Sequence, residues 1–373
     1  MADLYCPMIH GGLNINFKNN NGELGINQCC LSTEPLMSLD NDKIWKNLKF
    51  TSLREVNNQN QWDPNCWECR QIEAGGLKSF RKSMLEHYGK KYNLSGPLRI
   101  DFLFDRGCNL ACTICGPESS TLWQQYLKQN NMSYTNLNNS TDVDKVISAL
   151  KTLDLSNLEQ VHFCGGETLL GTSYWKLAEA LAELVPDAGK KLLVGFQTNG
   201  TQSINPKYYK IIEKFHLVKI FISIDGVEQK FNYLRWPGDW NQMTQNIMQM
   251  REKLPVNVMF CITETLSNFS LFYSGEVAAW IKNNFHANRL GDIVEHSQQL
   301  AVHNLLGIDA ITEEYAQVIK DRNTKQMLPN NWKENPSKIK KMLSETEKHD
   351  QIRGQNWKNT FPEIVQYYSR YLQ

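Results

Sequence analysis

The sequence has almost no excess of either charge: 40 lysine and arginine side chains are balanced by 39 aspartate and glutamate side chains, for a net charge of +1. Proteins that bind nucleic acid usually carry a clear basic excess, so this balance disfavours that class. The sequence also lacks an apolar run long enough to cross a bilayer. Its first residues, MADLYCPMIHGG, lack the basic start and apolar core of a secretory signal. We therefore expect a soluble, cytoplasmic protein with neither a membrane nor a nucleic acid as its partner.

Cysteine is scarce in the second half of the chain and concentrated in the first. Of the ten cysteines, only Cys164 and Cys261 lie beyond residue 115. The others form two groups at short spacings, which are Cys6, Cys29, Cys30, Cys66 and Cys69, and then Cys108, Cys112 and Cys115. A reducing cytoplasm disfavours a disulfide framework. Clustered thiols in that compartment usually bind a metal or an iron–sulfur cluster.

Composition and apolar pattern divide the chain into three segments. Residues 1–95 predict a small domain with a hairpin near its start and short helices around a C-x2-C pair. In residues 96–310, apolar runs typical of strands alternate with amphipathic helices, which predicts right-handed βαβ units and a parallel sheet, open or curled into a barrel. The runs lie at 98–104, 158–164, 191–198, 217–224, 255–263 and 299–306.

Residues 311–373 predict a charged, helical C-terminal extension. Its last stretch, FPEIVQYYSRYL, places Ile364, Tyr367, Tyr368 and Tyr371 on one face. Such a face is expected to dock on the preceding domain, and the alternative is a surface for a substrate or a partner.

The stretch GCNLACTICG contains three cysteines in the spacing C-x3-C-x2-C, at Cys108, Cys112 and Cys115. Three thiolates can bind three irons of a cubane cluster and leave the fourth iron open to a small chelating molecule. A structural zinc site instead needs four ligands in a closed tetrahedron, and no fourth ligand is evident nearby. The spacing therefore favours an open iron–sulfur cluster, while zinc binding and core packing remain the alternatives.

Three further motifs follow this triplet in order, each at the end of a predicted strand: CGGET (164–168), QTNGT (197–201) and SIDG (223–226). A fourth, FNYLRWPG (231–238), follows SIDG. In this arrangement the chain resembles the radical S-adenosylmethionine (SAM) superfamily. The resemblance implies an α/β fold with a partial (β/α)6 barrel of the TIM type, and a 4Fe–4S cluster on the three cysteines that binds SAM at its open iron.

The same resemblance implies the contacts of SAM, at the strand ends where ligands of parallel βα arrays bind. Gly165, Gly166 and Glu167 would receive the methionine amino group, and Arg235 would bind the methionine carboxylate as a two-pronged donor. The contacts implied for the nucleoside and its ribose are Thr198, Asn199, Ser223 and Asp225. Ile114 stands where many members carry an aromatic residue beside the adenine, so that contact is expected to be weaker here.

The first group of cysteines resembles the auxiliary modules called twitch and SPASM that accompany many radical SAM enzymes. One cysteine precedes the hairpin, one follows it, and a C-x2-C pair comes later. The resemblance implies a second 4Fe–4S cluster, closed by four thiolates, on Cys6, Cys29, Cys66 and Cys69. Cys30 is the alternate to Cys29, and zinc is the alternative metal for this module.

The two cysteines outside these groups, and one histidine, remain to be assigned. Cys164 directly precedes the Gly-Gly-Glu element and is a candidate donor of a hydrogen atom to a substrate radical, the alternative being a small core residue. Cys261 is expected in the core. His303 lies in the predicted sixth strand, and we expect it to be structural, the alternative being a contact with the substrate.

The resemblance implies an enzyme of the oxidoreductase or transferase type with two clusters and SAM as cofactors. It would draw electrons from a reductant such as flavodoxin or ferredoxin and abstract hydrogen from a C–H bond of its substrate. We expect a peptide or protein substrate, as in the maturation of ribosomal peptides by cross-linking, epimerisation, oxidation or excision. The alternatives are the same chemistry on a small metabolite, sugar or nucleotide, and a non-catalytic iron–sulfur or zinc scaffold. Radical modification of a nucleic acid is disfavoured by the charge balance.

Overall fold

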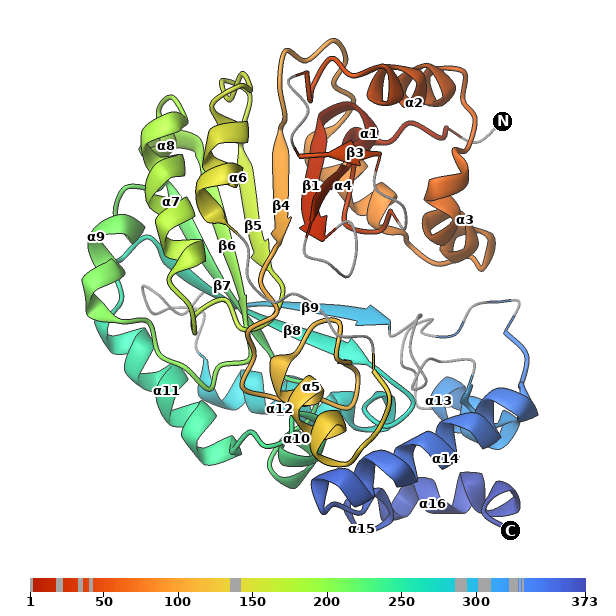
Figure 1. The fold of residues 1–373 in the computed structure, drawn as a ribbon. Helices are drawn as coiled ribbons and strands as arrows, with labels where there is room; N and C mark the ends of the chain where they lie inside the picture. The colour runs from red at the N-terminus through yellow and green to blue at the C-terminus, as the bar shows by residue number, and fades with distance from the viewer. Residues whose placement is uncertain are drawn as a thin grey trace. The chain divides into compact units, whose positions relative to one another are not determined.

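The computed structural model describes residues 3–17, 23–32, 36–39, 43–134, 142–285, 294–300, 310–321, 328, 330 and 332–373 (Figure 1). Contacts divide the chain into two compact units. The first unit comprises Met1–Arg106, Asn136–Gln197 and Asn205–Lys219, and the second comprises Gly107–Thr135, Thr198–Ile204 and Ile220–Gln373. These units do not coincide with the predicted segments 1–95, 96–310 and 311–373, which remain a prediction about functional modules.

The described strands form one sheet in the order β3-β2-β1-β4-β5-β6-β7-β8-β9. Their bounds are β1 Gly12–Phe17, β2 Leu24–Asn27, β3 Met37–Ser38, β4 Arg99–Leu103, β5 Gln160–Cys164, β6 Leu193–Thr198, β7 Leu217–Ser223, β8 Val258–Leu266 and β9 Val294–Leu300. β1 pairs with β4, β4 with β5, β5 with β6 and β8 with β9 in parallel, whereas β1–β2 and β2–β3 are antiparallel. The predicted α/β class with a largely parallel sheet and a helical C-terminus is confirmed.

The first five predicted strand runs of the parallel array correspond to β4 through β8. The sixth was placed too late, because β9 begins at Val294 and pairs with β8 from Phe260↔Val294 onward. Its sequence, VEHSQQL, is mostly polar and gives little of the apolar signal by which a strand is recognised. His303 and the rest of the run after Leu300 lie outside the described residues.

Alternation along the strands gives the sheet of the first unit one apolar and one polar face. On the apolar face, Phe102, Phe163 and Phe196 are all fully buried. Trp175 of α7 (Ser173–Leu184) stacks on Phe196 with ring centroids 4.6 Å apart, so this face forms the core beneath the helices (Figure 1). The opposite face carries Asn14 of β1 opposite Asp101 of β4. Polar residues thus line one side of the sheet.

Short capped helices complete the first unit. They are α1 Pro7–Gly11, α2 Leu48–Asn58, α3 Trp67–Ala74, α4 Phe80–Tyr88, α6 Val143–Leu150, α7, α8 Ala188–Lys191 and α9 Tyr209–Ile212. Asn47 and Ser79 begin α2 and α4 by accepting hydrogen bonds from the Lys49 and Lys82 amides, as N-cap residues do.

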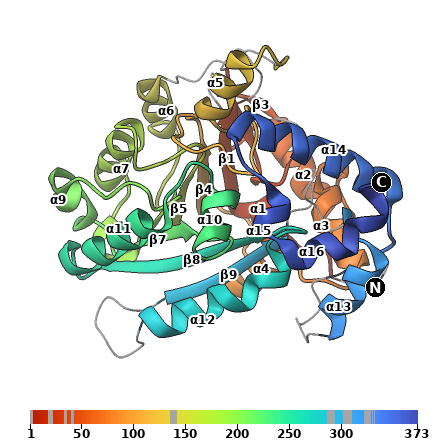
Figure 2. The same ribbon diagram turned by 90° about the horizontal axis from the view of Figure 1, so that it is seen from below.

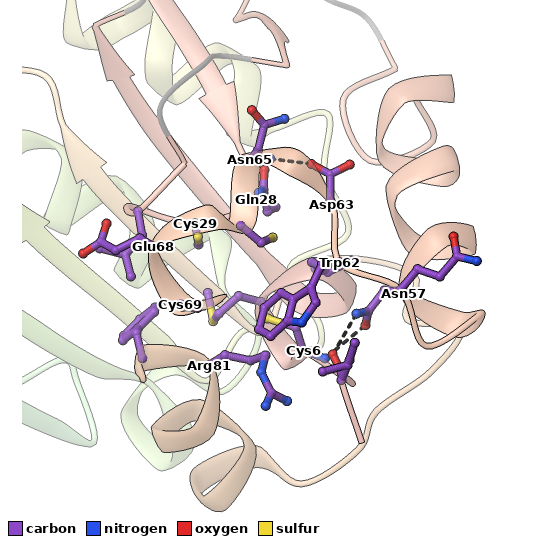
Figure 3. Close-up of a pocket in the computed structure, with 17 residues that line it drawn as sticks. Cys6, Gln28, Cys29, Asn57, Trp62, Asp63, Asn65, Glu68, Cys69 and Arg81 are labelled. Carbon is purple, nitrogen blue, oxygen red and sulfur yellow. Dashed lines mark hydrogen bonds between the residues drawn. The ribbon is translucent and has the colours of Figure 1, made fainter. Parts of the chain in front are cut away.

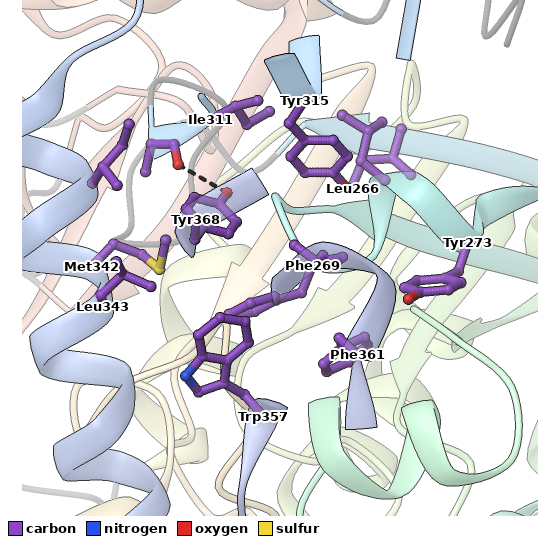
Figure 4. Packing of buried hydrophobic residues seen from close by; sticks show 14 of the residues in the cluster. Leu266, Phe269, Tyr273, Ile311, Tyr315, Met342, Leu343, Trp357, Phe361 and Tyr368 are labelled. Carbon is purple, nitrogen blue, oxygen red and sulfur yellow. Dashed lines mark hydrogen bonds between the residues drawn. The ribbon is translucent and has the colours of Figure 1, made fainter. Parts of the chain in front are cut away.

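The second unit is rich in helices. They are α5 Thr121–Gln129, α10 Gln229–Leu234, α11 Trp240–Lys253, α12 Ser274–Asn284, α13 Glu313–Asp321, α14 Pro336–Arg353, α15 Trp357–Thr360 and α16 Pro362–Tyr368. The C-terminal helices α13, α14 and α16 lie together (Figures 1 and 2). Figure 4 shows the apolar cluster that they share with the segment after β8, in which Phe269, Phe361 and Tyr368 are buried.

The predicted docking face of the last helix is found in this cluster. Ile364 and Tyr368 are fully buried, while Tyr367 and Tyr371 pack against the cluster from its margin. Cys261 is buried in β8, as expected for a core residue. No helix in the part of the chain that the structure describes combines the length and apolar character that a bilayer crossing requires.

Candidate functional site

The loop between β4 and α5 carries the three clustered cysteines, within the second unit. Cys112 is buried, and Cys108 and Cys115 are partly buried. Two backbone hydrogen bonds fix the loop to the segment after α10: the Ala111 amide donates to the Trp236 carbonyl at 2.6 Å, and the Thr113 amide donates to the Leu234 carbonyl at 2.8 Å. The motif LRWPG therefore holds the middle of the cysteine loop in place.

The side chains at the start of α5 hold both ends of this loop. Thr121 Oγ1 accepts from the Cys108 amide at 3.1 Å. Trp123 Nε1 donates to the Cys112 carbonyl at 2.9 Å, and Ser120 Oγ donates to the Leu110 carbonyl at 2.5 Å. The loop backbone is thus held by hydrogen bonds to the rest of the unit. Its three sulfur atoms are the groups that could bind a ligand.

The three thiols influence one another electrostatically. Burial raises the pKa of the Cys115 thiol, and the neighbouring Cys112 and Cys108 thiols raise it further. Burial likewise raises the pKa of the Cys112 thiol. Thiols in such surroundings ionise only when a cation joins them, and a coordinating metal deprotonates a thiol outright. Three neighbouring sulfurs of this kind fit an iron–sulfur cluster.

Asn199, directly after β6, is joined to the cysteine loop by a hydrogen bond. Its Nδ2 donates to Asn109 Oδ1 at 3.0 Å, and its Oδ1 accepts from Thr201 Oγ1 at 2.6 Å. Asn109 Nδ2 closes the triangle by donating to Thr201 Oγ1 at 2.8 Å. The sequence singled out neither Asn109 nor Thr201. Side chains that join two loops give no periodic signal, although Asn109 stands inside the motif itself.

Two residues expected to contact SAM bind each other. Arg235 Nη2 lies 2.6 Å from Asp225 Oδ2, and both side chains are buried. Asp225 Oδ1 also accepts from the Thr265 amide at 2.8 Å, while Arg235 Nε has no hydrogen-bond partner among the described residues. Burial raises the pKa of Asp225, and the charge of Arg235 opposes that shift. Asp225 and Arg235 therefore form a buried ion pair in which the Arg235 Nε–H can still donate a hydrogen bond.

The remaining predicted contacts are distributed over both units. Thr198 and Ser223 lie in the second unit with the cysteine loop, whereas Gly165, Gly166 and Glu167 lie in the first. Ser223 Oγ is 3.4 Å from Thr263 Oγ1. Ile114 packs against the C-terminal apolar cluster.

The Gly-Gly-Glu turn has a backbone that requires its first glycine. Gly165 has φ +126°, and a Cβ at this position would lie 2.6 Å from the Asp105 carbonyl oxygen. The Gly166 amide donates to the same oxygen at 2.8 Å. Glu167 is buried, and its Oε1 accepts from the Leu169 amide at 3.0 Å. The turn thus fixes a buried carboxylate directly after β5.

The polar face of the sheet in the first unit carries a linked group of side chains on β4 and β5. Arg99 Nε donates to Asp101 Oδ1 at 2.8 Å, and Arg99 Nη2 lies 3.3 Å from His162 Nδ1. Cys164 Sγ lies 3.3 Å from the same His162 nitrogen. Burial and the charge of Arg99 lower the pKa of His162 to about 4, and burial raises the pKa of Cys164 well above its usual value. A neutral imidazole and a protonated thiol therefore stand side by side.

Four cysteines of the first group line one pocket of the first unit, namely Cys6, Cys29, Cys66 and Cys69 (Figure 3). α1 begins directly after Cys6, and α3 begins directly after Cys66, so Cys66 and Cys69 stand one helical turn apart. Apolar contacts bring Cys29 and Cys66 against the cluster that contains Cys6.

The pocket disfavours ionised thiols unless a cation is bound. Burial raises the pKa of Cys6 to about 11, and burial together with the neighbouring Cys6 raises that of Cys66 to about 12. The buried Gln28 amide lies on the pocket wall, and its hydrogen bond to Cys66 opposes the rise in the pKa of that thiol. Cys30 is exposed and does not line the pocket. The donor set fits a cluster held by four sulfurs, with Cys29 in place of Cys30. Within the described ranges, no three His, Cys, Asp or Glu side chains are arranged to hold a single metal ion.

Comparison with known proteins finds a similarity for the central part of the chain. Residues 103–270 match the family model of the Radical SAM superfamily. This part of the chain is similar to that superfamily. The matched residues include the cysteine loop, the Gly-Gly-Glu turn, Asn199, and the pair Asp225 and Arg235.

Three solved structures are similar to this chain at low identity. The native anSMEcpe structure with bound AdoMet is 19% identical, with 69% of this chain and 63% of that chain covered and a TM-score of 0.40. Streptococcus suis SuiB bound to S-adenosylmethionine is 14% identical, with 75% of this chain and 58% of that chain covered and a TM-score of 0.36. Streptococcus suis SuiB bound to precursor peptide SuiA is 13% identical, with 86% of this chain and 57% of that chain covered and a TM-score of 0.38. The chain thus spans less than two thirds of the length of each. None of the curated protein sequences compared with the chain matches it.

Proposed function

We propose that this protein is a radical SAM enzyme that binds a 4Fe–4S cluster through Cys108, Cys112 and Cys115 and modifies a peptide or protein substrate. The observation that carries the proposal is the cysteine loop inside the matched radical SAM region, with its backbone bonded to Leu234, Trp236 and Trp123 and its sulfurs left for a ligand. When bound, the cluster and SAM together supply a 5′-deoxyadenosyl radical that abstracts hydrogen from a C–H bond.

The buried polar residues have distinct tasks in this proposal. Glu167 would pair with the methionine ammonium, and Arg235 would bind the methionine carboxylate while it keeps its contact with Asp225. Because Arg235 Nε has no partner among the described residues, the guanidinium retains a donor for a second anion. Asn199 would hold the loop through Asn109, which fixes the loop relative to the end of β6.

A second cluster in the pocket of Cys6, Cys29, Cys66 and Cys69 is the next part of the proposal. Its support is the convergence of four buried or partly buried thiols from three separate stretches of sequence. The resemblance of this cysteine pattern to twitch and SPASM modules favours a peptide substrate. We propose that this cluster accepts the electron left on a substrate radical.

The alternative fate of the substrate radical is to accept a hydrogen atom in place of losing an electron, and Cys164 is the proposed donor in that case. A donor must keep its S–H bond, and burial favours the protonated thiol over the thiolate. Arg99 can only donate, so the His162 Nδ1 that it contacts is an acceptor, and its one lone pair is shared between Arg99 and the Cys164 thiol. In the transfer the S–H bond breaks and a C–H bond forms on the substrate. The sulfur radical that remains is returned to a thiol by one electron and one proton from the reductant and solvent.

The polar face around Cys164 also suits a substrate rich in hydrogen-bond donors. Asp101 Oδ2 and Asn14 Oδ1 are buried acceptors without a hydrogen-bond partner among the described residues. Buried acceptors are costly unless satisfied, and peptide N–H groups would satisfy them. Hydroxyl groups of a sugar would serve as well, so a small polar metabolite is the alternative substrate.

Anaerobic reconstitution tests the enzyme proposal. The wild-type protein should bind about eight irons, as two cubanes do, and should release 5′-deoxyadenosine from SAM after reduction. Cys112→Ala should lose about half of the iron and all of the deoxyadenosine. Zinc without iron, or full iron loading without any deoxyadenosine, would leave the scaffold alternative. Transfer of deuterium from labelled peptides or labelled metabolites into deoxyadenosine then identifies the substrate class.

A further inference from the structure

Helix α14, in the C-terminal part of the chain, ends beside the cysteine loop of the same unit. Arg353, its last residue, donates from Nη1 to the carbonyl oxygen of Ala111 at 3.4 Å, although the two residues are 242 positions apart. Ala111 directly precedes Cys112, and the Arg353 side chain is fully buried. A buried cation thus contacts the backbone next to a cluster cysteine.

Several groups hold this guanidinium in place. Its Nη2 lies 3.2 Å from Asp350 Oδ1, one turn earlier on α14. The guanidinium carbon lies 5.1 Å from the centre of the Tyr233 ring and 5.7 Å from that of Trp123, within the range of cation–π attraction. Trp123 is also the residue that donates to the Cys112 carbonyl. Arg353 and the cysteine loop are therefore held by the same residue, Trp123.

The carboxylate that pairs with Arg353 is shared with other donors. Tyr233 Oη donates to Asp350 Oδ1 at 2.8 Å, and the Trp357 amide donates to Asp350 Oδ2 at 2.6 Å. By contrast, the nearby Arg235 has its carboxylate at 2.6 Å. Asp350 shares its negative charge among three donors, and its contact with Arg353 is longer than that between Asp225 and Arg235. The positive charge of Arg353 is therefore less fully compensated than that of Arg235.

A cation near a cluster favours one redox state. A 4Fe–4S cluster held by three thiolates is negative, and it gains a further negative charge on reduction, so a buried positive charge stabilises the reduced form more. Nearby charge and hydrogen bonding are among the means by which a protein sets a cluster's potential. The Arg353 charge acts on the Cys112 position from within the protein, where water screens it little.

We propose that Arg353 is a positioning residue of the C-terminal helix that fixes the Ala111–Cys112 peptide and raises the reduction potential of the cluster on the cysteine loop. The inference rests on the proposed function, since it requires a cluster on that loop. It assigns to residues 336–353 a role in tuning the cluster, a role that no motif in their sequence indicates.

The test compares the midpoint potential of the cluster in reconstituted full-length variants. The titration follows the part of the reduced cluster's paramagnetic resonance signal that changes when SAM is added, which separates this cluster from a second one. Arg353→Gln should shift the potential to a more negative value, and Arg353→Lys should restore most of it. Asp350→Asn leaves the cation less compensated and should shift the potential the opposite way.

Arg370→Gln is the matched control, because it removes the same charge from a half-exposed arginine of the same extension. It should leave the potential unchanged. Equal potentials in the wild type, Arg353→Gln and Asp350→Asn, each with full iron, would overturn the inference. If Arg353→Gln takes up no iron, Asp350→Asn decides by the same criterion.

A second measurement needs no cluster. Amide hydrogen exchange of residues 108–115 in the iron-free protein should be faster in Arg353→Gln than in the wild type and unchanged in Arg370→Gln. Equal exchange in all three would overturn the positioning role. A wild-type protein whose loop takes up no iron, or shows no signal sensitive to SAM, would instead refute the proposed function, which keeps the two failures distinct.

Discussion

Arg99 Nη2 lies 3.3 Å from His162 Nδ1 on the polar face of the sheet, where β4 and β5 run in parallel. A guanidinium is always charged and only donates, so it requires the neutral imidazole. Burial and this charge lower the pKa of His162 to about 4. The Arg99–His162 contact therefore links the protonation of a histidine to the stability of the sheet.

The pH dependence of unfolding tests this contact. The unfolded protein binds a proton at His162 near pH 6.5 and the folded protein does so only near pH 4. The unfolded state thus holds more protons between these values, and stability falls as the pH falls through that window. We expect a loss on the order of 3 kcal/mol from this group between pH 7 and pH 4. His162→Asn keeps an acceptor and should flatten the dependence in urea titrations, whereas replacement of the exposed His216 by Asn should not.

Gly165→Ala should destabilise the protein and disturb the turn that carries Glu167. The substitution places a side chain at φ +126° and a Cβ 2.6 Å from the Asp105 carbonyl. Strain of this kind costs about 1–3 kcal/mol before the clash is counted. Gly171→Ala is the control, because its Cβ would meet only Asp105 Oδ2 at an ordinary 3.6 Å. Denaturant unfolding measures both, and equal stability of the two variants would contradict the geometry.

The buried pair Asp225 and Arg235 should behave as a coupled unit. Removing one partner leaves an uncompensated buried charge, which costs about 3–5 kcal/mol. We expect Asp225→Asn and Arg235→Gln each to lower stability strongly, and the double variant to be less destabilised than the sum. A double-mutant cycle by urea unfolding measures the coupling. Additive effects would mean that the 2.6 Å contact contributes nothing.

The pocket of the first unit predicts which cysteines retain iron. Cys69→Ser should lose about four irons of the eight expected for two cubanes, because Cys69 lines the pocket. Cys30→Ser should keep them, since Cys30 is exposed and points elsewhere. The buried Cys261 supplies a second control as Cys261→Ser. Iron and sulfide analysis after reconstitution measures the result, and loss of iron in Cys30→Ser would make it the ligand in place of Cys29.

Much of the fold could be predicted from periodicity, and the exceptions have physical reasons. Apolar runs predicted β4 through β8, since these strands bury many of their side chains in the core. β9 was misplaced because VEHSQQL gives little apolar signal. The pairing of β1 with β4 joins strands separated by more than eighty residues, which no local pattern reveals.

The candidate site was predictable where its residues fall in motifs. The spacing of Cys108, Cys112 and Cys115 indicated the loop, and the glycine at 165 indicated the turn whose positive φ it serves. Arg353 and Asn109 could not be identified, because their roles depend on contacts between distant segments. The salt bridge between Asp225 and Arg235 was likewise unforeseen, since each had been assigned to a different part of SAM.

The register of β1 on β4, with Gly12 opposite Arg99, makes the cysteine-rich front of the chain continuous with the backbone of the sheet. The Leu98 amide, just before β4, is bonded to the Gly11 carbonyl at 2.7 Å, so the two segments enter the sheet together. A protein engineer who exchanges this front for that of another enzyme must therefore transplant a strand in its register, and not only a set of sulfur ligands. This N-terminal segment could be transferred as one piece only to a protein whose sheet offers the same free strand edge.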